Sequence, residues 1–197
     1  MSLKFTILGC GSSLGIPRID GYYGNCDPNN EKNVRTRCSA LIRSKNLNIL
    51  IDTSPDLKSQ LLANKVKNID KVFYTHAHAD QTHGINELRV FSLKNRKKIP
   101  IYADLITKRS LINTFGYCFE DYKNYPSILD AKTLKNKHIL NEVNSKIIIK
   151  FYITVIIDIF FNNKISCNFF NFVINIYTEP SCIYKCFLII HVYFITI

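Results

Sequence analysis

The sequence has 197 residues, of which 47% are hydrophobic and 21% charged, values that are ordinary for a soluble globular protein. The length leaves room for one domain or two very small ones. The formal net charge of +11 suits a phosphorylated or polyanionic partner, but lysine and arginine are scattered along the chain, which favours an ordinary solvated surface over a dedicated groove for nucleic acid.

The cysteines and the apolar segments predict a cytoplasmic protein with no membrane contact. The seven cysteines are odd in number and no pair has CxxC spacing, which favours reduced thiols over a disulfide framework. The apolar stretch at the N-terminus is too short for a signal peptide. Charged residues interrupt the apolar runs near the C-terminus before they reach the roughly 20 residues that a membrane-spanning helix needs.

Strands and helices are expected to alternate over the first 114 residues. Apolar runs rich in β-formers predict strands at residues 3–8, 38–43, 47–51, 71–74 and 99–103. Ser54 can cap a helix whose first turn suits Pro55 and whose apolar face is formed by Leu57, Leu61, Leu62 and Val66. Further helices are predicted at about 85–91 and 104–114. The short connections indicate an α/β layered architecture.

A histidine-rich loop follows the strand predicted at residues 71–74. Three histidines and one aspartate fall within eight residues, in the string THAHADQTHG. In an extended loop His76 and His78 project to the same side, and Asp80 continues that alternation. Two imidazoles can share one divalent ion, and a carboxylate offers an oxygen ligand to a second. A metal site is therefore favoured over ordinary polar histidines.

The same string resembles the H-x-H-x-D-H signature of the metallo-β-lactamase superfamily. The segments LGCGSSLGIPRI, NCDPNNEKNVRTRCSALI, LIDTSPDL and THAHADQTHGINELR resemble the branch that contains phosphoribosyl cyclic phosphodiesterases and related phosphodiesterases. The resemblance extends from about residue 3 to about residue 140. It implies an αββα sandwich that holds up to two zinc or manganese ions at one edge of its two sheets.

The resemblance also assigns roles to the residues of the loop. His76 and His78 would bind the first metal and Asp80 the second, with Asp80 also orienting the attacking water. The fourth signature position, a histidine in the family, is Gln81 here, and glutamine is a weak neutral ligand. His83 either compensates for this change or is a surface residue at the start of a helix.

Four other residues are candidates for supporting roles. Asp52 resembles the family aspartate that supports the metal loop, with a simple turn aspartate as the alternative. Arg18, Arg35 and Arg37 lie in loops that approach the site in this family, and a guanidinium group suits a phosphate. The alternative for these arginines is an ordinary solvated surface position.

The implied activity is hydrolysis of a small phosphodiester of the phosphoribosyl cyclic phosphate type through a metal-activated hydroxide. A tRNA 3′-processing endonuclease is the alternative that would make nucleic acid the substrate, but no inserted arm for clamping tRNA is visible in the sequence. The alternative that is not an active enzyme is a catalytically impaired or inactive remnant of such a hydrolase. The sequence leaves the oligomeric state open.

The composition changes near residue 145. Residues 1–145 are interpreted as the metal-binding N-terminal half of the fold and residues 146–197 as an apolar tail, which from residue 147 lacks Gly, Ala, Arg and Gln. Three interpretations of the tail remain open: buried strands, a membrane-contacting segment, or a degenerate or frameshifted product, which we favour. After His83 the chain contains only His138 and His191, so the ligands that the family takes from its second half are missing or degenerate.

Overall fold

The computed structural model describes residues 4–134 and, beyond them, strands within residues 137–142, 145–151, 174–175, 187–188 and 190–196. The chain divides into two compact units. One unit consists of residues 1–134 with 177–186, and the other of residues 135–176 with 187–197. The described part of the first unit carries all the candidate site residues.

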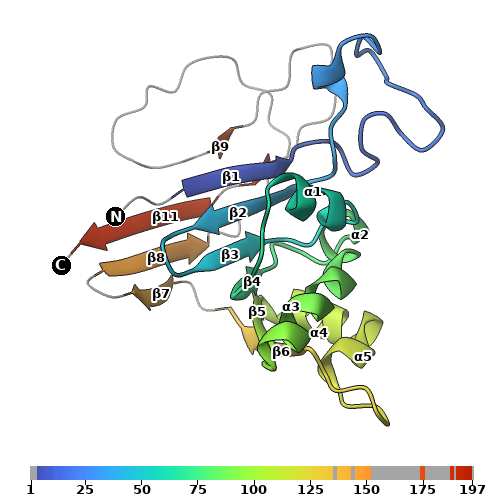
Figure 1. Ribbon diagram of the computed structural model, residues 1–197. Helices are drawn as coiled ribbons and strands as arrows, with labels where there is room; N and C mark the ends of the chain where they lie inside the picture. The colour runs from blue at the N-terminus through green and yellow to red at the C-terminus, as the bar shows by residue number, and fades with distance from the viewer. Residues whose placement is uncertain are drawn as a thin grey trace. The chain divides into compact units, whose positions relative to one another are not determined.

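The first unit is built on a six-stranded sheet whose strands follow chain order across the sheet (Figure 1). The pairs β1–β2 and β2–β3 are antiparallel, whereas β3, β4, β5 and β6 run parallel to one another. The carboxyl ends of the last four strands therefore meet at one edge of the sheet. The strands are β1 Lys4–Gly9, β2 Ser39–Arg43, β3 Asn48–Ile51, β4 Lys71–Phe73, β5 Ile99–Ala103 and β6 Leu129–Thr133.

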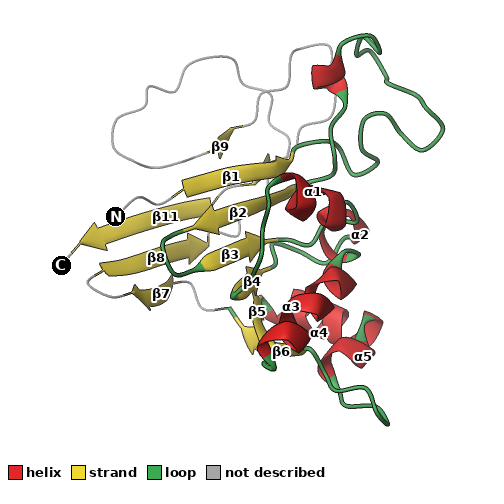
Figure 2. Ribbon diagram, in the orientation of Figure 1, coloured by secondary structure: helices red, strands yellow, loops and turns green. Residues whose placement is uncertain are grey.

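Helices cover one face of this sheet (Figure 2). The α-helices are α1 Leu57–Ala63, α2 Ala79–Thr82, α3 Arg89–Asn95, α4 Leu105–Thr114 and α5 Gly116–Phe119, and the 3₁₀ turns are η1 Glu31–Asn33 and η2 Ile85–Leu88. Their apolar side chains join those of the strands in one core. The core includes Leu41, Leu50, Val72 and Ile101 from the strands and Leu57, Leu61, Leu88 and Leu111 from the helices.

The central strands are buried on their other face as well. Ile42, Ile49 and Phe73 alternate with the residues of the helix-facing core and are at most 1% exposed. The rings of Phe73 and Tyr102 stack with their centroids 4.7 Å apart. Burial on both faces explains why these strands read as continuous apolar runs rather than as alternating patterns.

The strands predicted before residue 104 are all present, within one or two residues of the expected ends. The helix after residue 54 begins later than expected, because Asp56 and not Ser54 is its N-cap residue. Leu62 does not share the buried face of this helix and is 69% exposed. The helix expected at 85–91 is divided into η2 and α3, and α2, α5 and β6 were not predicted.

The described part of the second unit consists of strands. β7 Lys137–Glu142 and β11 Ile190–Thr196 both pair antiparallel with β8 Ser145–Phe151, and β9 Ile174–Asn175 pairs with β10 Phe187–Leu188. His138 is paired with Ile149, and His191 with Lys150. The rest of the predicted tail, residues 146–197, lies outside the described residues.

Two further sequence expectations concern the cysteines and the membrane. Cys26 and Cys38 are disulfide-bonded, so the expectation of reduced thiols is wrong at these two positions, whereas Cys10 and Cys118 carry free thiols. Over the described residues, every helix is too short or too polar to cross a bilayer.

Candidate metal site

The histidine loop lies at the carboxyl edge of the parallel strands. It begins directly after β4, and Asp52 directly follows the neighbouring strand β3. The backbone N–H of Asp52 donates to the carbonyl of Phe73 at 2.9 Å, which extends the pairing of the two strands to their ends. Parallel strand ends thus bring together two segments that lie more than twenty residues apart in the sequence.

Asp52 is buried against this loop, with 2% of its surface exposed. Its carboxylate accepts one hydrogen bond from the backbone N–H of Thr75 at 2.8 Å and another from the Thr75 hydroxyl at 2.7 Å. Burial raises the pKa of Asp52 to about 7, the nearby Asp80 adds to this effect, and the two bonds from Thr75 oppose it. The backbone of Asp52 is left-handed, with φ of 58°, a conformation that aspartate tolerates better than most residues.

Thr75 also orients the first histidine of the loop. Its hydroxyl oxygen lies 2.9 Å from Nδ1 of His76. Because the hydroxyl proton is donated to Asp52, the oxygen accepts from the N–H at Nδ1 and leaves the Nε2 lone pair free. Desolvation and the adjacent His78 lower the pKa of His76, which favours the neutral imidazole that binds metals.

His76 and His78 lie side by side, as the sequence predicts. Their ring centroids are 4.7 Å apart and the rings meet edge to face at 79°. Asp80 does not continue the alternation, because α2 begins at Ala79 and places Asp80 in its first turn. Asp80 is nevertheless close enough to raise the pKa of His76 electrostatically.

The last two predicted ligands have different surroundings. Gln81 is 4% exposed, its backbone carbonyl accepts from the N–H of Thr53 at 2.7 Å, and its side-chain Oε1 has no hydrogen-bond partner. His83 is exposed, and its ring contacts Phe115 edge to face with centroids 5.4 Å apart. Nδ1 of His83 also lies 3.2 Å from the Thr82 hydroxyl.

These donors fit one cation better than two. His76 and His78 present adjacent imidazoles, and the orphaned buried Oε1 of Gln81 is an acceptor that a cation would satisfy. However, within residues 4–134 and the five later strands, no three His, Cys, Asp or Glu side chains gather in a group able to hold a metal ion. Among the described residues, His76 and His78 are therefore the adjacent donors from which a metal site can be built.

The three candidate phosphate-binding arginines all have partners within the protein. Arg37 forms a two-pronged ion pair with Asp56, with Nε–Oδ2 and Nη2–Oδ1 distances of 2.9 and 2.6 Å. The hydrogen bond from Arg37 lowers the pKa of the Asp56 carboxyl and outweighs its desolvation. Arg18 pairs with Asp20, and Nε of Arg35 donates to the carbonyl of Lys32 at 3.3 Å.

Thr53 and Gly84 complete the connection between the strand end and the loop, and sequence reasoning identified Gly84 only as a tight turn and gave Thr53 no role. The Thr53 hydroxyl lies 2.9 Å from the Tyr74 hydroxyl, and the Thr53 carbonyl accepts from the N–H of Gly84 at 2.9 Å. A Cβ atom at Gly84 would lie 2.0 Å from the carbonyl oxygen of Ser54, so only glycine fits there. Two of the supporting residues had a visible signal in the sequence: Thr75 directly precedes His76, and Gly84 is a glycine at the end of the histidine string.

A family model described as the β-lactamase superfamily domain matches residues 47–142, which contain Asp52 and the complete histidine loop. Residues 47–142 of the chain thus belong to this superfamily. The α/β fold expected from the resemblance is confirmed, since solved structures of this fold align with about three-quarters of the chain.

Two solved structures and one curated protein illustrate the relationship. A diphosphatase of the PhnP family is 28% identical, with a TM-score of 0.61 over 75% of this chain and 56% of its own. Zinc-bound PqqB from Methylobacterium extorquens is 16% identical, with a TM-score of 0.53 over 76% of this chain and 52% of its own. An octanoyltransferase from Porphyromonas gingivalis is 30% identical over 118 residues, which are 59% of this chain and 24% of that protein. The chain thus spans about half the length of the two solved proteins and a quarter of the curated one.

Proposed function

We propose that this chain carries the metal-binding half of a hydrolase that acts on small phosphodiesters of the phosphoribosyl cyclic phosphate type, with zinc or manganese as the cofactor. The observation that carries the proposal is the pair of adjacent imidazoles, one of them oriented by Thr75 and Asp52. The diphosphatase of the PhnP family, which is 28% identical to this chain, supports a small phosphate compound as the kind of substrate.

In the proposed site each residue has a separate task. His76 offers Nε2 and His78 its ring nitrogen to one cation, while Thr75 and Asp52 hold the His76 ring in that orientation. When bound, the cation supplies Lewis acidity, which makes water a better nucleophile and offsets the negative charge of the phosphodiester. The carboxylate of Asp80, in the first turn of α2, is the group placed to accept a proton from the attacking water.

A catalytically impaired remnant is the second candidate, and a specific observation favours it. Gln81 occupies the signature position of a histidine ligand, and its amide is buried in a helical turn. No third His, Cys, Asp or Glu side chain among the described residues joins the two histidines. Under this alternative the chain binds a single ion weakly and turns over no substrate.

Metal content and turnover, measured on the same preparations of the full chain, test both candidates. We expect about one bound zinc or manganese ion per chain and slow hydrolysis of a chromogenic phosphodiester, with both lost in His76→Ala and both retained in His83→Ala. Bound metal without turnover supports the remnant. Turnover that survives His76→Ala and His78→Ala contradicts the proposed site. Hydrolysis of a precursor tRNA but not of a cyclic phosphodiester overturns the substrate class.

A further inference from the structure

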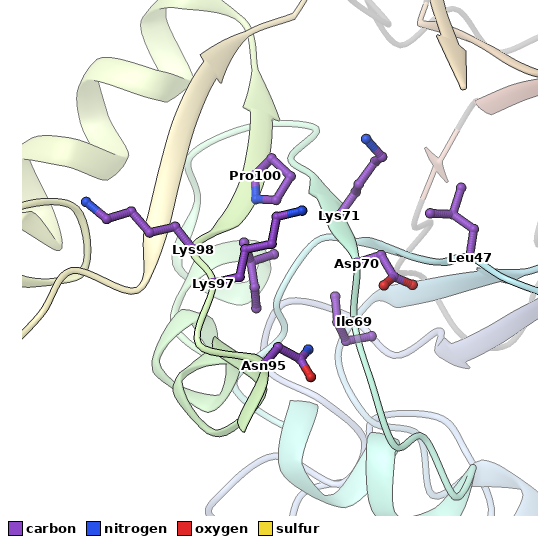
Figure 3. Close-up of a pocket in the computed structure, with 9 residues that line it drawn as sticks. Leu47, Ile69, Asp70, Lys71, Asn95, Lys97, Lys98 and Pro100 are labelled. Atoms are coloured by element: carbon purple, nitrogen blue, oxygen red, sulfur yellow. The ribbon is translucent and has the colours of Figure 1, made fainter. Parts of the chain in front are cut away.

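A hollow lies at the amino ends of β3, β4 and β5, opposite the edge of the sheet that carries the histidine loop. It has a volume of about 250 Å³ and is lined by residues at the starts of β3, β4 and β5 (Figure 3). The histidine loop follows the carboxyl ends of β3 and β4, so the length of the strands separates the two places. This hollow is therefore independent of the candidate metal site.

Two lysines line the hollow beside Asp70 and form no ion pair within the described residues. Lys71 begins β4, and Lys97 lies between α3 and β5. Their side chains extend beside Pro100, whereas the side chain of Lys98 points away (Figure 3). Lys98 has its own ion pair, 3.9 Å from Asp121. Within the described part of the chain neither Lys71 nor Lys97 forms an ion pair, and the Lys71 ammonium lies 5.7 Å from the centroid of the Tyr102 ring.

Asp70, the acidic residue that lines the hollow, is committed to the fold. Its Oδ2 accepts from the backbone N–H of Asn48 at 2.7 Å, and its Oδ1 accepts from the Asn68 amide at 2.7 Å. These bonds join the start of β3 to the segment before β4. Both donors are neutral, so Asp70 keeps its formal negative charge, but together with Lys71 and Lys97 the lining has a net positive formal charge that can attract an anion.

Apart from Asn95, the rest of the lining is apolar. Ile69 and Ile99 are 1% and 3% exposed, and Leu47 and Pro100 lie beside them. The volume is below the roughly 300–1,000 Å³ of pockets for drug-sized ligands, which favours a small ligand. Ammonium groups above an apolar surface suit a ligand with a phosphate group and a short organic body.

We propose that this hollow binds a small phosphate-bearing anion through Lys71 and Lys97. In the proposed complex each ammonium group forms an ion pair with the anion. Because the lysines are partly exposed, the affinity falls as the salt concentration rises.

Calorimetric titration with pyrophosphate tests the proposal, with the full chain at low ionic strength after metal removal by a chelator. We expect the double variant Lys71→Gln/Lys97→Gln to raise Kd by about tenfold or more, since each ion pair to a phosphate is charge-assisted. The matched control Lys98→Gln removes one positive charge from the same segment and is expected to change Kd by less than about twofold. Lys97→Gln alone replaces an exposed side chain and provides a second measurement if the double variant does not fold.

Three outcomes would overturn the proposal. The first is a wild-type chain that binds no pyrophosphate. The second is a double variant that binds as well as the wild type. The third is binding that persists in the lysine variants and disappears in His76→Ala, which would assign the anion to the histidine loop. His76→Ala with unchanged pyrophosphate affinity keeps the two sites separate, whatever the result for the proposed hydrolase.

Discussion

The Asp52 carboxylate accepts hydrogen bonds from both the backbone N–H and the hydroxyl of Thr75, and these two bonds join the end of β3 to the loop after β4. One acidic side chain thereby fixes the start of the histidine loop and, through the Thr75 hydroxyl, the ring of His76. Two features of Asp52 are costly, its burial and its left-handed backbone, and both serve this contact. The first two predictions concern this pair.

Replacing Thr75 by valine removes the hydroxyl with little change in shape. The buried Asp52 then loses one donor, which should lower the free energy of unfolding by about 1–3 kcal/mol. His76 loses the acceptor for its Nδ1 proton, so zinc affinity should fall by about 10- to 100-fold. Urea denaturation and zinc titration measure the two effects. Thr75→Ser retains the hydroxyl and should restore most of both, and a Thr75→Val protein with normal zinc affinity would contradict the orienting role.

The stability of the metal-free chain should fall as the pH rises from about 4 to about 7. Burial raises the pKa of Asp52 from 3.8 to about 7, so the folded state binds a proton in this range that the unfolded state has released. The stabilising effect of this bound proton is complete below the pKa of Asp52 in the unfolded chain. It is lost as the pH rises through the pKa of Asp52 in the folded chain, and its upper limit is on the order of 4 kcal/mol. Denaturation midpoints measured across this range provide the test.

Asp52→Asn is the control for that measurement. Asparagine tolerates the same left-handed backbone but has no proton to exchange, so its stability profile should be flatter between pH 4 and 7. Equal slopes for the two proteins would show that Asp52 does not titrate in this range.

Arg37 and Asp56 should stabilise the fold rather than bind substrate. Removing the guanidinium leaves a half-buried carboxylate without its partner, so Arg37→Ala should cost about 1–2 kcal/mol in unfolding free energy. Because Arg37 lowers the pKa of Asp56, the pair's contribution is present above about pH 4 and is lost as the pH falls through the lowered value.

Arg35→Ala is the matched control for Arg37→Ala, since Arg35 donates from Nε only to a backbone carbonyl at 3.3 Å. We expect its unfolding free energy to change by less than about 0.5 kcal/mol. If Arg37→Ala unfolds like the wild type but raises KM for a phosphodiester, Arg37 binds substrate and the structural role is wrong.

Gly84 should not tolerate a side chain. The Cβ of Gly84→Ala would collide with the backbone carbonyl of Ser54, and the strand end and the loop would have to separate. A loss of about 3 kcal/mol or more is expected, with weaker metal binding as the loop shifts. Gly116→Ala is the control, because a Cβ at that position meets no atom within 4 Å. Thermal unfolding of the two variants distinguishes a local clash from a general effect of alanine.

The sequence by itself determined the local elements and the location of the chemistry. Continuous apolar runs specify the central strands because these strands are buried on both faces, as Ile42, Ile49 and Phe73 show. The position of His76 and His78, two residues apart after a strand, was sufficient to place their rings together. Such features depend on neighbours in the sequence, so periodicity and spacing can reveal them.

The tertiary structure decided which side chains are partners. Asp52 and Thr75 are 23 residues apart and meet because β3 and β4 are parallel neighbours. Arg37 and Asp56 are 19 residues apart, and the fold likewise brings them into contact. The start of α2 at Ala79 removed Asp80 from the expected alternation. Lys71 and Lys97 meet at one hollow because their strands begin at the same edge of the sheet. Strand pairing determines these contacts, and no local pattern encodes it, because pairing depends on the free energy of the whole packed sheet.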